Sequence, residues 1–230
     1  MKKAVVWGLG AVSVVALAVS LYWIFVVLPI VPREQTGFSQ KIFYFHMPAA
    51  IISFVAFIVT FVASILFLAK KDFKYDILAY SSAEIGLVFG VVLMIFGITW
   101  DKLAWGVWWT WDPRLVTYLI LLFLFGAYFF LRSMVSERMK QARFAAVFGI
   151  IAALDVPVSF FSTRLIKNVL HPVIFSREGF GLDMNMTIAL LLAFAGMTAL
   201  YVLMLMLKLK VEHMMEDVHV LKDMIESRRD

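Results

Sequence analysis

The sequence predicts an all-α integral membrane protein with six transmembrane helices. Of its 230 residues, 63% are hydrophobic and only 16% are charged, whereas soluble domains average about 45–50% apolar and about 25% charged residues. Six apolar segments also approach the roughly 20 residues that cross a bilayer. In a chain of this composition, a net charge of +5 indicates orientation in a lipid bilayer rather than nucleic-acid binding.

The predicted spans belong to one polytopic membrane domain and cover residues 4–28, 48–69, 77–98, 115–131, 144–161 and 186–207. The first apolar run is longer than the roughly 7–15 residues of a signal-peptide core, so we expect an uncleaved span. Pro48 is expected to open the second span, because proline suits the first turn of a helix. The segments between spans are too short to form a separate soluble domain.

Lysine and arginine counts predict the orientation of these spans. The two chain ends and the loops after spans two and four carry 14 of these residues, and the loops after spans one, three and five carry seven. Since the positive side is cytoplasmic, we expect both termini inside and the loops after spans one, three and five outside. Residues 208–230 form a cytoplasmic amphipathic tail that binds either a partner or the membrane surface. Its apolar residues follow a three–four spacing: Val211, Met214, Val218, Leu221 and Ile225.

The outer loop after the third span holds five of the seven tryptophans: Trp100, Trp105, Trp108, Trp109 and Trp111. If residues 105–112 are helical, Trp105, Trp108, Trp109 and Asp112 share one face and form a flat indole wall. An ordinary aromatic belt places only a few indoles at each interface, so the density favours a platform for a large planar ligand. Asp112 and Pro113 are typical of a helix start.

Two histidines, His46 and His171, fall in the outer loops that flank the tryptophans, and none falls within a predicted span. Two neutral imidazoles can ligate a haem iron while indoles cover the porphyrin. The propionates would need cations, of which Arg114 adjoins the tryptophans and can bind a carboxylate with two hydrogen bonds. The other outer cations are Arg33, Lys41, Lys102, Arg164, Lys167 and Arg177. No cysteine is present, which excludes thiolate ligands, and no catalytic set is evident, so we do not expect an enzyme.

These residues together resemble the CcmC family of haem-handling proteins in bacterial cytochrome c maturation. Residues 105–115 match the family pattern Trp-Gly-x-Trp-Trp-x-Trp-Asp-x-Arg-Leu at every fixed position. The segments around His46 and His171 are similar to those that carry the family's two haem-ligating histidines. One departure is Asp101, which follows Trp100 where the family commonly has a small residue.

The resemblance implies a protein of the bacterial inner membrane that holds haem b on its periplasmic face between His46 and His171. It also implies transfer of the haem to a chaperone of the CcmE type. The implied partners are the ABC transporter subunits CcmA and CcmB, the small membrane protein CcmD and the lipid bilayer. Longer relatives such as CcmF and CcsA-type synthetases share the tryptophan motif, and a CcsA-like synthetase subunit stays an alternative.

The residues alone leave two further functions open. A transporter could use the tryptophans as an aromatic cage for an organic cation, and a structural subunit could carry an unusually rich aromatic belt. The predicted spans hold only two ionisable residues, Glu84 and Asp155. Such residues are costly in a bilayer, and we expect them to bond to neighbouring helices.

Overall fold

The computed structural model describes residues 3–30, 37–165 and 182–226, and every regular element in these ranges is a helix. The helices are α1 (Lys3–Tyr22), α2 (Gln40–Lys70), α3 (Phe73–Trp105), α4 (Pro113–Met134), α5 (Arg138–Ala153), α6 (Asp155–Leu165) and α7 (Met184–Glu226). A π-helical turn, η1 (Trp23–Val27), follows α1, and a 3-10 turn, η2 (Gly37–Ser39), precedes α2. Six stretches are long and apolar enough to cross a membrane, which confirms the predicted fold class.

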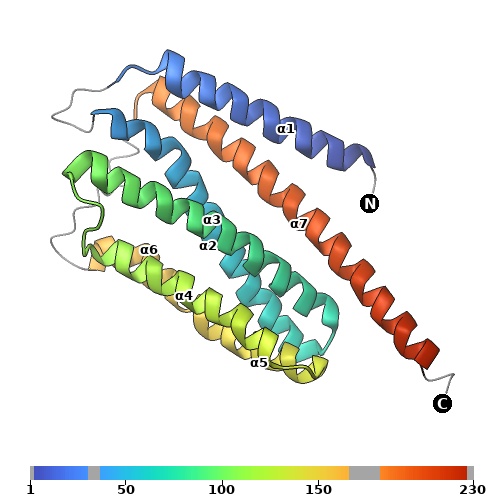
Figure 1. Cartoon of the computed structure of the whole chain (residues 1–230). Coiled ribbons are helices and arrows are strands. Elements are labelled where there is room, and N and C mark those ends of the chain that lie inside the picture. Colours follow the sequence, from blue (N-terminus) through green and yellow to red (C-terminus); the bar gives the residue numbers. More distant parts are fainter. Residues whose placement is uncertain (1–2, 31–36, 166–181, 227–230) are drawn as a thin grey trace.

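The helices form an elongated bundle in which α1 lies beside α7, while α4, α5 and α6 lie on the opposite side of α2 and α3 (Figure 1). Both ends of the described chain lie at one end of the bundle, together with the α2–α3 and α4–α5 connections (Figure 1). The connection between α3 and α4 lies at the opposite end, which we call the tryptophan end. The connectivity therefore separates the tryptophan-rich connection from both termini, as the sequence predicts.

Helix α2 is the centre of the core and packs mainly against α3. Phe57 of α2 stacks on Phe125 of α4, with 3.8 Å between ring centroids. A Cβ atom on Gly86 of α3 would lie only 2.9 Å from the Cβ atom of Ala56, so this glycine allows the two backbones to approach closely. Small residues at helix contacts are typical of membrane proteins, where packing rather than water exclusion holds helices together.

The start of α2 corrects one expectation about His46. The helix begins at Gln40, so Pro48 lies inside it rather than at its start. Proline removes only one backbone hydrogen bond, the one to Tyr44, and continuing the helix keeps the other backbone groups bonded where water is scarce. His46 is therefore a helical residue within an apolar stretch that can cross a membrane, not a loop residue.

The fifth predicted span is interrupted, because α5 ends at Ala153 and α6 begins at Asp155. Pro157 cannot donate a hydrogen bond to the carbonyl of Ala153, and its ring crowds that carbonyl, which explains the break. The last predicted span and the tail instead form one 43-residue helix, α7, about 64 Å long at 1.5 Å per residue. The apolar residues of the tail are all exposed: Val211, Met214, Val218, Leu221 and Ile225.

Ion pairs join the helices at the end of the bundle that holds the termini. Arg132 of α4 binds Asp76 of α3 through two hydrogen bonds of 2.6 and 2.9 Å. Glu84 of α3 pairs with Lys208 of α7 at 2.8 Å, as expected for an acid that links the bundle. The same expectation for Asp155 is wrong, because its buried Oδ2 has no hydrogen-bond partner among the described residues. The predicted span boundaries left Asp76 in a loop, so its buried partnership with Arg132 was not predicted.

Candidate functional site

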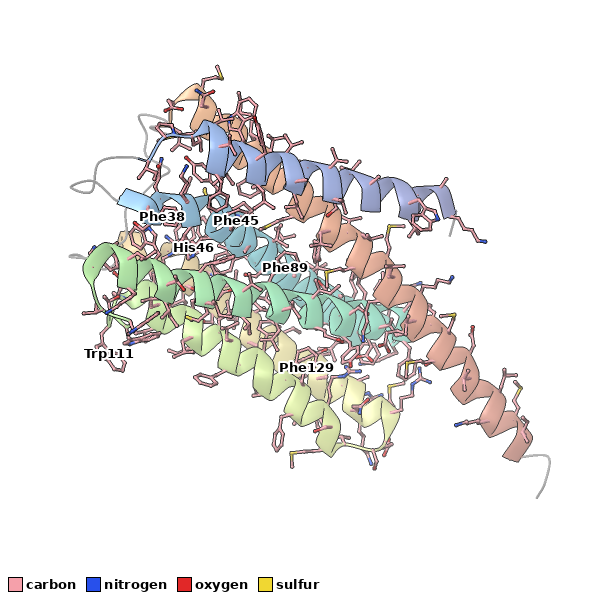
Figure 2. The ribbon with its side chains drawn as sticks, turned by 45° about the horizontal axis from the view of Figure 1, so that its top comes forward. Phe38, Phe45, His46, Phe89, Trp111 and Phe129 are labelled. Atoms are coloured by element: carbon pink, nitrogen blue, oxygen red, sulfur yellow. The ribbon has the colours of Figure 1, made fainter. Side chains whose placement is uncertain are left out.

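The candidate site lies at the tryptophan end of the bundle, where α2, α3 and α4 meet. His46 and Trp111 both lie at this end (Figure 2). The segment between α3 and α4, residues 106–112, has no regular secondary structure. We call it the tryptophan segment.

The imidazole of His46 lies close to Gly97 of α3. A Cβ atom placed on Gly97 of α3 would lie 3.3 Å from Cε1 and 3.9 Å from Nδ1 of His46. The same point is 3.7 Å from Cδ2 of Leu115 on α4. Since carbon atoms pack best at about 3.5–4.0 Å, a methyl group at position 97 would crowd the imidazole.

A small cavity lies beside this imidazole and has a volume of about 30 Å³. Its lining includes the polar side chains His46, Arg114 and Tyr118. A cavity of this size holds about one water molecule, whereas enclosed ligand pockets measure about 300–1,000 Å³. The cavity therefore does not enclose a large ligand, and Arg114 lines it together with His46.

The tryptophan segment is not helical, so the expected flat indole wall along residues 105–112 is wrong. Helix α3 ends at Trp105 because Gly106 adopts the left-handed conformation, with φ of +78°. Glycine adopts this conformation without strain and commonly ends helices. The signal for the break was present in the sequence, at Gly106.

The indoles form two edge-to-face pairs rather than one plane. Trp100 and Trp105 have ring centroids 4.8 Å apart at 80°, and Trp109 and Trp111 have centroids 5.9 Å apart at 83°. Trp111 is 82% exposed and Trp108 is 60% exposed, while Trp109 packs against the apolar core. Trp108 and Trp111 are therefore available to a ligand, and Trp109 anchors the segment.

Polar contacts hold both ends of the tryptophan segment. Lys102 donates a 2.9 Å hydrogen bond to the Gly106 carbonyl, and its ammonium lies 5.7 Å from the Trp108 ring centroid. Asp112 is buried and accepts a 2.9 Å hydrogen bond from the backbone N–H of Arg114, which confirms its predicted role as the N-cap of α4. The loop is thus fixed to the helix before it and the helix after it.

A further contact in the segment was not predicted from the sequence. The Thr110 hydroxyl donates a 2.8 Å hydrogen bond to Oδ2 of Asp101, whose side chain is fully buried near the end of α3. The only signal for it was the acidic residue directly after Trp100, where a small residue is common in the family that the sequence resembles.

One predicted cation has a different role. Lys41 is only 3% exposed, and its ammonium donates hydrogen bonds to the carbonyls of Ile24 and Leu28, where α1 ends in the π-helical turn. These carbonyls have few partners at a helix end, so Lys41 joins α1 to α2 rather than facing a ligand. Several predicted residues lie outside the described part of the chain: His171, Arg33, Lys167, Arg177 and the side chain of Arg164.

The fold and the site together define a polytopic membrane protein with an imidazole and exposed indoles at one end of a helical bundle. Comparison with known proteins gives the particular family. The family described as heme exporter protein C, CcmC, matches residues 1–223, and the chain belongs to this family. Membership in this family supports a role for this chain in haem handling for cytochrome c maturation.

Three relatives, each named heme exporter protein C, illustrate the similarity. The protein of Rhodobacter capsulatus is 28% identical over 208 residues, covering 88% of this chain and 84% of its own length. That of Bradyrhizobium diazoefficiens is 30% identical over 222 residues, covering 96% and 83%. That of Haemophilus influenzae is 30% identical over 208 residues, covering 89% and 83%.

Proposed function

We propose that the chain binds haem b as a cargo at the tryptophan end, with His46 and His171 as axial ligands of the iron, and presents it to a haem chaperone of the CcmE type. The observation that carries the proposal is the placement of His46, whose ring lies close to Gly97 and lines one cavity together with Leu115 and Arg114. An imidazole whose orientation is fixed by packing is suited to ligate a metal, because little freedom remains to be lost on binding.

The shape of the site favours haem held at the surface. The cavity beside His46 is too small to enclose a porphyrin. Trp108 and Trp111, which lie a few residues before Arg114 of the cavity lining, present exposed rings. Arg114 can pair with a propionate.

Connectivity supports the proposal of His171 as the second ligand. The described end of α6 and the start of α7, which flank the stretch that contains His171, both lie at the tryptophan end (Figure 1). Both histidines can then serve one iron from opposite sides of the haem. A haem held in this way keeps an exposed edge, and an acceptor protein can compete for it without entering the bundle.

The excess of lysine and arginine favours a cytoplasmic location for the end that holds the termini. The haem site then faces the periplasm from the inner membrane of a bacterium. The proposed partners are the ABC transporter subunits CcmA and CcmB and the small membrane protein CcmD. Binding and transfer need no nucleophile or hydrolytic site in this chain, so the proposed function is not enzymatic.

The absorption spectrum of the purified protein tests this proposal. We expect a Soret band in protein from haem-replete cells, and loss or a shift of the band when His46 and His171 are both replaced by glycine. Addition of a purified CcmE-type chaperone should move the haem from the loaded protein to the chaperone. A wild-type protein that is colourless and binds no added haem would contradict the proposal and favour an organic-cation cage or a structural subunit.

A further inference from the structure

Asp101 is a buried acid next to the candidate site that neither the fixed positions of the tryptophan motif nor the proposed haem ligands include. Its side chain has no exposed surface although it lies only a few residues from the end of α3. Burying a carboxylate is costly unless hydrogen bonds compensate. The Thr110 hydroxyl supplies one such bond at 2.8 Å, from the middle of the tryptophan segment.

The partner of Asp101 lies between two tryptophans of opposite exposure. Thr110 is flanked by Trp109, which packs against the core, and by Trp111, which is 82% exposed. Because the Thr110 side chain is tied inward to α3, the backbone on either side of it has a fixed direction. The edge-to-face arrangement of the two flanking rings, 5.9 Å apart, then depends on this hydrogen bond as well as on ring packing.

The same stretch of α3 also positions His46. Gly97, at which an added Cβ atom would lie 3.3 Å from the imidazole, is four residues before Asp101, and residues four apart lie on the same face of a helix. One face of α3 thus carries Gly97, which borders the proposed iron ligand, and Asp101, which is hydrogen-bonded to the segment that carries the indoles. Their relative placement is set by a rigid helix rather than by the loop.

We propose that Asp101 is a positioning residue for haem binding, and that its hydrogen bond with Thr110 holds the tryptophan segment in the conformation that receives the porphyrin. This inference rests on the proposed function. A segment that is ordered before binding loses less entropy when the ligand arrives. Hydrogen bonds to charged groups are the stronger ones, so loss of this bond is expected to lower the fraction of molecules that are ready to bind.

The test compares threonine variants that remove or retain the hydroxyl. Thr110→Val removes the donor with little change of shape, and Thr110→Ser retains it. Thr99→Val is the matched control, because the Thr99 hydroxyl bonds only to the Ile95 carbonyl of its own helix in the described contacts. Haem affinity is measured by titration of each purified protein, and hydrogen exchange of residues 106–112 reports the order of the segment.

We expect Thr110→Val to weaken haem binding about tenfold and to speed hydrogen exchange in the tryptophan segment. The bis-histidine spectrum of the haem that still binds should be unchanged. Thr110→Ser and Thr99→Val should bind within about twofold of the wild type. Asp101→Ala should also weaken haem binding, and the double variant should lose less than the sum of the two single losses, since the two side chains are hydrogen-bonded to each other.

The outcomes separate this inference from the proposed function. If the wild type binds haem and Thr110→Val binds it equally well, the positioning role of Asp101 is refuted while the haem site stands. Equal losses in Thr110→Val and Thr110→Ser would also refute it, because the hydroxyl would then be irrelevant. If the wild type itself binds no haem, the proposed function fails first.

Discussion

Filling the space at Gly97 tests the placement of His46 most sharply. In Gly97→Ala the new methyl group would lie 3.3 Å from Cε1 of the imidazole, so the ring must move by a few tenths of an ångström. Overpacking of this kind costs about 1–3 kcal/mol. If about 1 kcal/mol of this overpacking energy applies only to the haem-bound state, haem affinity falls about fivefold. Gly97→Val should abolish detectable binding, since a larger group cannot be accommodated by so small a shift.

Gly126→Ala on α4 is the matched control, because nothing lies within 4 Å of its added Cβ atom. Both alanine substitutions gain helix propensity, by about 1 kcal/mol, so the two variants differ in the contact with His46. Haem affinity is measured by titration of the Soret band, and thermal unfolding of the same samples reports stability. Wild-type affinity and an unshifted spectrum in both Gly97 variants would refute the packing argument for His46.

Four further substitutions have expected outcomes. Lys41→Met should lower the unfolding temperature, because two buried carbonyls lose a charged donor at about 1–3 kcal/mol each, and it should leave haem affinity unchanged. A loss of affinity at unchanged stability would show that Lys41 belongs to the haem site. Arg132→Leu strands the buried Asp76 carboxylate and should destabilise the protein by about 3–5 kcal/mol in chemical unfolding; an effect below about 1 kcal/mol would show that the pair is dispensable. Trp111→Ala should weaken haem binding with no change in thermal stability, whereas Trp109→Ala should lower both haem affinity and thermal stability. Trp7→Ala is the control for Trp111→Ala, because Trp7 is similarly exposed at the other end of the bundle.

The fold class and the number of spans could be predicted because hydrophobicity alone decides which segments enter a bilayer. The helix ends were harder to predict, since hydropathy marks the apolar stretch and not the hydrogen-bonded helix. Helix α2 thus begins before Pro48, and α7 continues without a break through the predicted end of its span. In α7 the composition changes from apolar to polar at the start of the tail while the helix continues. Hydropathy therefore marked an end where the helix has none.

The residue types of the candidate site could also be predicted, but their arrangement could not. Helical periodicity suggested one indole face, yet the left-handed conformation of Gly106 ends α3 and makes the segment irregular. Lys41 was grouped with ligand-binding cations because charge alone does not reveal that a side chain is buried against a helix end. The Asp101–Thr110 contact joins residues on different elements, which sequence spacing cannot show.

The most direct test of a haem held by His46 at the tryptophan end is ligand replacement followed by magnetic circular dichroism. The wild type loaded with haem should show a low-spin signal with two imidazole ligands. His46→Gly should lose this signal and regain it when free imidazole is added, whereas the control His213→Gly on α7 should match the wild type. A His46→Gly protein that retains the wild-type signal without added imidazole would show that another residue holds the iron, and the proposed site would be wrong.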